Sequence, residues 1–293
     1  MAKTSCRLRI ASAANLLTLS RSFRFAALSV RMTAAAMLVA APVQAQQRQP
    51  DFRWEKALAA GSVIGIHNLS GDVTVTPSTT GKVDVLGVKH GRDRDDVTIE
   101  VVETRDGISV CPMYKDVDME CNERGLQVHD SWGRRHRRHG DRDWEDASID
   151  IEVRLPKGME LSAHSVSGNV SVVGAEGDVR AGSVSGDVRM EGLRITSLRA
   201  SSVSGNVQVG IAALSGNGDL KFSSVSGDVT ADLPANLDAD VSMHTVSGSL
   251  DSDFPLTLNG RMSRSRLEAR IGKGGRDLEV STVSGNVRLR AAK

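Results

Sequence analysis

Residues 129–146, HDSWGRRHRRHGDRDWED, hold the densest group of side chains that could bind a metal or another ligand. Three imidazoles, His129, His136 and His139, lie here beside several carboxylates. Metal binding needs imidazoles whose second ring nitrogen is fixed by a hydrogen-bond partner. A segment without apolar periodicity is instead typical of an exposed loop. A solvated, self-compensating charge run is therefore favoured over a metal site.

The basic centre of the same segment suggests a second chemistry, which is contact with an anionic group. Clustered arginines attract anions such as an anionic glycan, lipopolysaccharide phosphate or nucleic acid, and flanking tryptophans can stack on a ligand. The candidate contact residues are Trp132, Arg134, Arg135, His136, Arg137, Arg138, His139 and Trp144.

Catalytic patterns are poorly represented in the chain. No GxSxG, HExxH or phosphate-binding glycine-rich motif occurs. The many serines of the C-terminal half lack a recognisable base, which a serine nucleophile requires. We therefore predict a protein that is not an enzyme, with no catalytic, metal or cofactor site. A hydrolase or lyase acting on envelope polysaccharide is the alternative, and would need two carboxylates about 5–9.5 Å apart in a cleft.

The N-terminal segment predicts export. Residues 1–45 contain six basic residues and no acidic one, and an apolar stretch at 32–43 ends in the small-x-small pattern Val43-Gln44-Ala45. This arrangement is typical of a cleaved signal peptide, and the stretch is short for a membrane-spanning helix of about 20 residues. We expect a signal peptide at 1–45, a linker at 46–57, a periplasmic or extracellular location, and no membrane anchor after cleavage.

Removing the signal peptide changes both the charge and the cysteine count. It leaves 31 Lys and Arg residues against 36 Asp and Glu, a net charge of −5. Such a chain has no global attraction for nucleic acid, so no nucleic acid partner is expected. Cys111 and Cys121 remain, ten residues apart, in an oxidising compartment. A disulfide is favoured over a metal pair, because the CxxC spacing of zinc sites is missing.

A hexapeptide repeat dominates the part of the chain after residue 160. Six near-copies read SVSGNV (165–170), SVSGDV (183–188), SVSGNV (202–207), SVSGDV (224–229), TVSGSL (245–250) and TVSGNV (282–287). Their central glycines are Gly168, Gly186, Gly205, Gly227, Gly248 and Gly285. A period near 20 residues is typical of a solenoid. The last interval is 37 residues, which predicts one coil that has lost its motif between Ser252 and Gly275.

Alternation within the motif predicts which side chains point inward. If each copy is one strand, Val184, Gly186, Val188 and Met190 share the inner face, and the intervening polar residues share the outer one. The motif glycine could supply a positive φ or allow close approach of neighbouring backbones. Both possibilities stay open at this point. Ser, Asn and Asp beside it suit turns or hydrogen-bonded ladders better than a calcium site.

The region before the repeat is also rich in predicted strands. Apolar or alternating segments at 62–66, 73–76, 82–89, 97–103, 108–111 and 148–155 are punctuated by Gly, Asp or Pro, as strands are. We expect a less regular β-rich part at 58–155 with an exposed loop at 112–147, followed by the repeat solenoid at 156–293. The predicted fold class is all-β, a β-solenoid or β-helix-like stack.

The repeat, the sequence IGKGGRDLEVSTVSGNVRL at 271–289 and the upstream ISVCPMYKD, with a second cysteine and then IDIEVRLPKGMEL, resemble a known family. It is the bacterial β-strand-repeat domain of unknown function labelled the putative adhesin family. The resemblance covers about residue 58 to the end. It implies an exported β-solenoid with no established catalytic activity, and it carries over no ligand residues.

We therefore predict an exported, noncatalytic binding or structural module of the cell envelope. Its partner would be a glycan, a protein or an anionic surface group, met by a polar outer face. An accessory or sensor protein of an envelope-stress pathway is a further alternative. A strand edge left open near the C-terminus would also permit edge-to-edge self-association.

Overall fold

The computed structural model describes residues 50–115, 117–129, 147–259 and 263–292. The predicted signal peptide lies outside these residues. Within them, no helix is long and apolar enough to cross a membrane. Strands make up nearly all of the regular structure, so the predicted all-β solenoid is confirmed.

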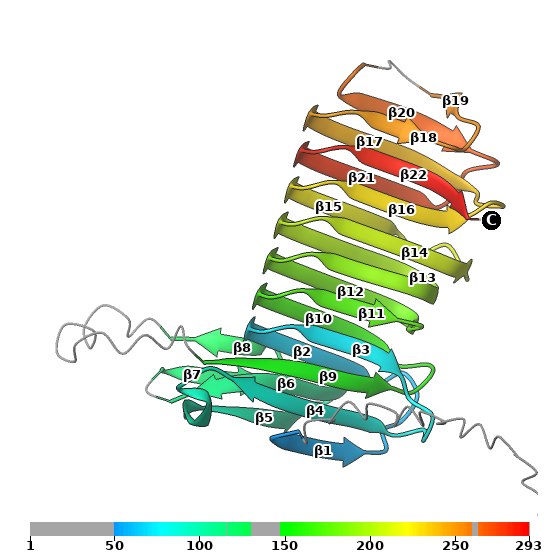
Figure 1. Ribbon diagram of the computed structural model, residues 1–293. Coiled ribbons are helices and arrows are strands. Elements are labelled where there is room, and N and C mark those ends of the chain that lie inside the picture. Colours follow the sequence, from blue (N-terminus) through cyan, green and yellow to red (C-terminus); the bar gives the residue numbers. More distant parts are fainter. Residues whose placement is uncertain (1–49, 116, 130–146, 260–262, 293) are drawn as a thin grey trace, which may run out of the picture. The chain divides into compact units, whose positions relative to one another are not determined.

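Short parallel strands stack into a column in which each rung contains two strands joined at the motif glycine (Figure 1). We call the strands before the glycine the upstream sheet and those after it the downstream sheet. β13 (Val188–Ser204) runs from the downstream sheet of one rung into the upstream sheet of the next, so that hydrogen bonds link both into one continuous sheet. The hydrophobic core lies between the upstream sheet and the downstream sheet.

The upstream sheet begins with an antiparallel pair and continues in parallel to a cap. Its spatial order is β5 (Val97–Glu103), β6 (Gly107–Tyr114), β2 (Val63–Ser70), β10 (Glu160–Ser167), β12 (Glu176–Ser185), the C-terminal half of β13, β15 (Leu220–Ser226), β21 (Asp277–Ser284), β17 (Ala239–Ser247), β20 (Arg266–Ile271) and β19 (Thr257–Leu258).

The downstream sheet follows the same rungs. Its order is β1 (Phe52–Lys56), β4 (Val83–His90), β9 (Ser148–Leu155), β3 (Val73–Pro77), β11 (Val170–Val173), the N-terminal half of β13, β14 (Val207–Leu214), β16 (Val229–Pro234), β22 (Val287–Ala292) and β18 (Leu250–Ser252). A short 3-10 helix (Arg94–Asp96) and a hairpin of β7 (Met119–Asn122) and β8 (Gly125–Val128) complete the described elements.

The strands predicted before the repeat are all present, as β2, β3, β4, β5, β6 and β9. The predicted exposed loop at 112–147 is wrong in its first part. Residues 112–114 finish β6, and the β7–β8 hairpin follows, with Cys121 and Gly125 buried. The less regular part and the repeat part form one stack, because β2 and β3 pair directly with β10 and β11.

The predicted inward direction of the first motif valine is wrong. Val184 is 44% exposed, whereas Ser183, which was predicted to face outward, is only 6% exposed. The copy is not one strand, because β12 ends at Ser185 and β13 begins at Val188. Alternation therefore restarts after the bend, where Val188 and Met190 are buried as predicted.

Close approach of neighbouring rungs explains the motif glycines. A Cβ added at any of the six would lie 1.8–2.2 Å from the carbonyl oxygen of the glycine one rung away. No real Cβ tolerates such a distance, so the bends can stack at strand spacing only where the side chain is a hydrogen atom. Of the two possibilities that the sequence left open, close approach is the requirement common to all six.

The order of the rungs differs from the order of the copies in the chain. β21 and β22 carry the last copy and insert between β15–β16 and β17–β18 (Figure 1). The 37-residue interval is therefore not a coil without a motif. Its chain forms β19 and the antiparallel cap β20, then returns into the stack.

This order also corrects the expectation of an open C-terminal strand. β22 pairs with β16 on one side and β18 on the other, so it is interior. Self-association through a sheet edge stays a prediction, and at this end of the stack it would involve β18 or β19.

Replacing one motif glycine should be far more costly than replacing a glycine inside an adjoining strand. We expect Gly205→Ala to lower the free energy of unfolding by about 2 kcal/mol or more, because the new methyl group meets a backbone carbonyl. Gly210→Ala is the matched control, since its Cβ would meet no atom closer than 3.5 Å. Urea titration followed by circular dichroism measures both, and equal losses would contradict the close-approach requirement.

Candidate binding surface

The first hydroxyl of every motif copy is engaged inside the stack. It donates to the carbonyl oxygen of the motif glycine, or of Gly71, one rung away at 2.7–3.1 Å. The donors are Ser165, Ser183, Ser202, Ser224, Thr245 and Thr282, each no more than 6% exposed. These hydroxyls satisfy buried carbonyls and are not nucleophiles.

The residue after each glycine forms a second ladder. Its spatial order is Asp72, Asn169, Asp187, Asn206, Asp228, Asn286 and Ser249. Each backbone N–H donates to the side-chain oxygen of the previous rung at 2.7–3.0 Å, and the asparagine amides also donate to the aspartates. From Asp72 to Ser249 no two neighbouring rungs of this ladder carry aspartates, so stacked like charges are avoided there. Beyond Asp72 its N–H donates to Asp150 Oδ1 at 2.9 Å, and Asp150 pairs with His90. The interpretation as a hydrogen-bonded ladder is confirmed.

The second residue of each copy points outward and forms an exposed apolar stripe, which we call the valine ridge. Its members are Val166, Val184, Val203, Val225, Val246 and Val283, which are 44–66% exposed. The matched register of the flanking serines places them one per rung, about 4.8 Å apart. Scattered exposed valines need no explanation, but a continuous row can mark a contact surface. Sequence reasoning missed this ridge because it treated each copy as one straight strand.

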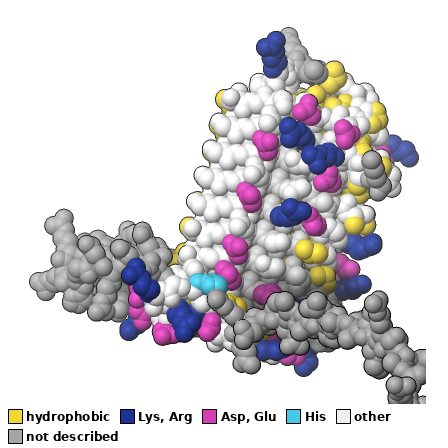
Figure 2. All heavy atoms as spheres, in the orientation of Figure 1, with side chains coloured by type: hydrophobic (Ala, Val, Ile, Leu, Met, Phe, Trp, Pro, Cys, Tyr) yellow, Lys and Arg dark blue, Asp and Glu magenta, His cyan; other side chains and the backbone are white. Residues whose placement is uncertain are grey.

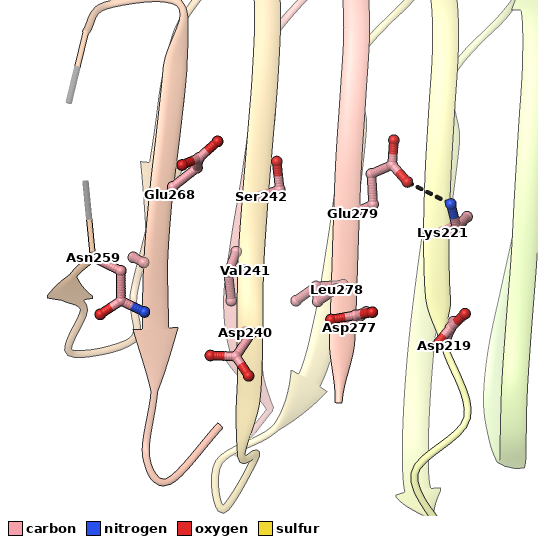
Figure 3. Close-up of a pocket in the computed structure, with 11 residues that line it drawn as sticks. Asp219, Lys221, Asp240, Val241, Ser242, Asn259, Glu268, Asp277, Leu278 and Glu279 are labelled. Atoms are coloured by element: carbon pink, nitrogen blue, oxygen red, sulfur yellow. Dashed lines mark hydrogen bonds and ion pairs between the residues drawn. The ribbon is translucent and has the colours of Figure 1, made fainter. Parts of the chain in front are cut away.

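Acidic side chains recur along the stack on the face seen in Figure 2. On the other side of the stack, a different set of acidic side chains lines a shallow pocket of about 450 Å³ on the upstream sheet near the cap (Figure 3). Asp219, Asp277 and Asp240 lie on three consecutive rungs there.

Two carboxylates of this acidic pocket, Glu279 and Asp240, have cationic partners. Lys221 Nζ lies 2.6 Å from Glu279 Oε2, and Arg270 Nε donates to Asp240 Oδ1 at 2.9 Å. The Arg270 hydrogen bond and the Gly275 N–H lower the pKa of Asp240. A carboxyl that gives up its proton more readily cannot serve as the general acid of a glycosidase, which needs a raised pKa.

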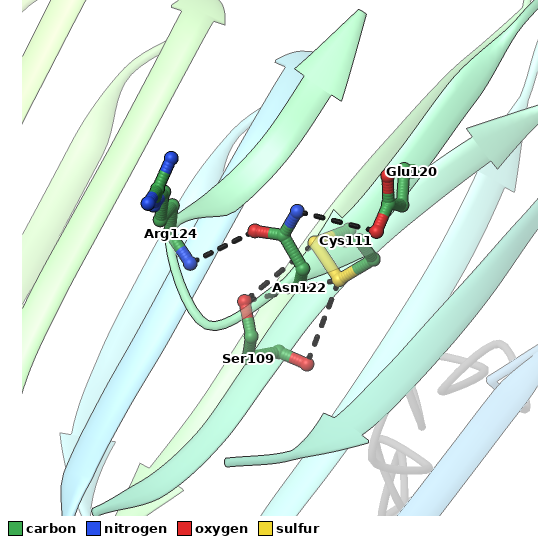
Figure 4. The surroundings of a disulfide bond; sticks show 6 residues. Ser109, Cys111, Glu120, Asn122 and Arg124 are labelled. Atoms are coloured by element: carbon green, nitrogen blue, oxygen red, sulfur yellow. Dashed lines mark hydrogen bonds between the residues drawn. A yellow bond between two sulfur atoms is a disulfide. The ribbon is translucent and has the colours of Figure 1, made fainter. Parts of the chain in front are cut away.

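A disulfide fastens the β7–β8 hairpin to the stack. Cys111 of β6 and Cys121 of β7 are bonded, and Ser109 Oγ lies 3.7 Å from Cys111 Sγ (Figure 4). The Asn122 side chain accepts the Arg124 N–H and shapes the turn. The predicted disulfide is present in the structure.

The hairpin covers a histidine that stacks on a second one. A Cβ on Gly125 would lie 2.4 Å from His67 Cε1, so the hairpin backbone rests against this imidazole. The His67 and His164 rings are 6.1 Å apart and nearly parallel. Burial, and then the proximity of His164, lower the pKa of His67 to about 4. Partial burial and the charge of Arg180 also lower the pKa of His164.

All eight contact residues predicted from the sequence belong to the segment 130–146. Trp132, Arg134, Arg135, His136, Arg137, Arg138, His139 and Trp144 lie outside the described residues. His129 is described, is exposed, and donates its backbone N–H to Asp118 O. Among the described residues no cluster of three or more His, Cys, Asp or Glu side chains could hold a metal ion.

The comparisons with known proteins agree with this architecture. The family described as Toastrack DUF4097 matches residues 64–290, which is most of the chain. The chain belongs to this family. Residues 64–290 run from β2 to β22 and include every copy of the motif, so the family defines the stack as a whole. None of the curated proteins compared with the chain matches it.

Similar solved structures include two bacterial proteins. One is described as a putative cell adhesion protein from Clostridium sporogenes, with 9% identity, a TM-score of 0.49, and coverage of 83% of this chain and 100% of that one. The other is described as a putative adhesin from Bacteroides fragilis, with 15% identity, a TM-score of 0.40, and coverage of 82% and 99%.

The half-buried His67 predicts a pH dependence of stability. Because the folded state lowers the pKa of His67 to about 4, its stabilisation is complete above the unfolded value near 6.5 and is lost as pH falls towards 4. We expect the free energy of unfolding to drop by about 1–3 kcal/mol over this range, and His67→Asn to flatten the profile. Urea midpoints at pH 7 and pH 4.5 measure it. The control is His244→Asn, which changes an exposed imidazole, and an equal flattening by both variants would contradict the assignment.

Proposed function

We propose that the protein is an exported, noncatalytic binding module of the cell envelope that contacts an extended partner along the valine ridge. The valine ridge is the observation that carries this proposal. It gives the same apolar contact on successive rungs, and a partner that runs along the stack would meet each of them in turn.

The internal use of the polar motif groups supports a noncatalytic role. The first hydroxyl of each copy bonds to a glycine carbonyl, and the Asp and Asn side chains bond to one another. These groups stabilise the stack and have little capacity left for acid, base or nucleophilic work. The acidic pocket is where the alternative, a glycosidase, would need its two carboxylates. Two of its carboxylates, Asp240 and Glu279, are instead paired with cations there.

Two features support an exported location. Residues 1–45 have the charge and small-x-small pattern of a signal peptide. The Cys111–Cys121 disulfide suits an oxidising compartment, since such bonds rarely persist in the cytosol. The partner would then be a component of the envelope or of a neighbouring cell surface.

Polar substitution of the valine ridge tests the proposal. We expect the full chain carrying Val203→Thr and Val225→Thr to bind isolated cell envelopes about fivefold more weakly than the unmodified protein, because apolar contact area is lost on adjacent rungs. Threonine keeps the β-branched shape and suits a strand. Sedimentation with envelopes at graded protein concentrations measures the affinity.

The matched control is Val128→Thr with Val173→Thr. Both of these valines are exposed by 40% or more but lie outside the ridge. Unchanged binding by the ridge variant, or an equal loss in the control, would refute the ridge as the contact surface.

A further inference from the structure

A column of cationic side chains runs beside the valine ridge on the outer face of the upstream sheet. Arg180 of β12, Arg199 of β13 and Lys221 of β15 are direct neighbours in register on three consecutive rungs. Lys221 pairs with Glu279 on the fourth rung. The column therefore carries two further positive charges that this ion pair does not neutralise.

The two arginines lack protein partners within the part of the chain that the structure describes. Neither guanidinium has an ion pair or side-chain hydrogen bond with a described residue, and both side chains are exposed. Like charges directly opposite one another on neighbouring strands are destabilising. Asp178, two residues before Arg180 on the same face, accepts the Ser197 N–H instead. An anion between the guanidinium groups would relieve their repulsion.

A lane of small residues separates the arginines from the valine ridge. In register, Gly182, Ser201, Ser223 and Ser281 follow one another along the stack, and His164 and His244 occupy the next positions at its two ends. A Cβ on Gly182 would lie 3.0 Å from both His164 Nδ1 and Ser201 Oγ, a tight contact that these two side chains would have to move to relieve. A ligand in this lane would meet hydroxyl groups below it, guanidinium groups on one side and valines on the other.

We propose that this lane binds a linear acidic polysaccharide through carboxylate groups held by Arg180 and Arg199. Arginine presents a planar fork that matches a carboxylate, the serines can hydrogen-bond sugar hydroxyls, and the valines contact the less polar faces of the rings. The inference rests on the proposed function, because it names the ligand class of the same surface.

A glycan suits this surface better than a nucleic acid. Single-stranded nucleic acids are bound by aromatic side chains on which bases stack. The described strands of this outer face present Arg, Lys, Ser, Gly, His and Val around the lane, without a Phe, Tyr or Trp ring among these positions. The chain without residues 1–45 would also carry a net negative charge.

Binding of polygalacturonate, a linear polymer of uronic acid, tests the inference with the full chain. We expect Arg180→Gln combined with Arg199→Gln to weaken binding at least tenfold, and the double lysine variant to give an intermediate loss, because it keeps the charge but not the fork. The control, Arg189→Gln with Arg288→Gln, makes the same change in net charge on the downstream sheet, where these arginines are near Glu191 and Asp228. It should stay within twofold of the unmodified protein.

Polymers that are neutral, or that carry phosphate instead of carboxylate, test which chemical group is recognised. Neutral dextran should bind at least tenfold more weakly than polygalacturonate, and so should single-stranded DNA. Equal binding of dextran or DNA, or equal losses in the arginine variant and its control, would overturn the inference. Tighter arginine-dependent binding of polyphosphate would overturn the carboxylate assignment.

The envelope-binding assay separates this inference from the proposed function. Suppose that Val203→Thr with Val225→Thr weakens envelope binding, but the arginine substitutions leave polygalacturonate binding unchanged. The proposed ligand class is then wrong, and the valine ridge is retained as the contact surface. If the valine variant leaves envelope binding unchanged, the proposed function fails. Circular dichroism of each variant checks that the stack is folded.

Discussion

The approach of one backbone bend to the next is the constraint on which the rest of the structure depends. Each motif glycine lies so close to the glycine carbonyl of the neighbouring rung that a methyl group would collide with it. The same carbonyl accepts the buried hydroxyl of the motif. A buried carbonyl without a partner would be costly, so the glycine is needed together with a Ser or Thr hydroxyl. Once the bends stack in this way, the strands on both sides are held in register.

Register then decides what the surface can present. A solenoid repeats every outward position along its axis, and any side chain becomes one member of a column. Apolar and uncharged columns repeat without cost, as the valine ridge does, whereas charged columns need alternation or a partner. The Asp and Asn ladder alternates. Arg180 and Arg199 place two positive charges on adjacent rungs without such alternation. This departure is the reason to look for an anionic partner there.

The sequence was sufficient for the architecture because the repeat is so regular. It predicted the all-β stack, the early strands, the disulfide and the alternation after each glycine. It failed where a bend interrupts alternation, since Val184 and Ser183 exchange faces for a reason that only the path of the backbone reveals. It also failed on rung order, because copies related by similar sequence can pair in any order. Lys221 and Glu279 are 58 residues apart in the chain, yet their side chains meet.

The inserted last rung has a consequence for how the chain reaches its native state. In an ordinary solenoid, folding can nucleate in one repeat and spread to the next. Here the slot between β15 and β17 must be filled by β21, which is synthesised after the cap strand β20. Loop closure over such a separation costs entropy before any contact compensates for it. This end of the stack therefore cannot close until β21 has been made, and a chain stalled before that point would leave the facing edges of β15 and β17 unpaired.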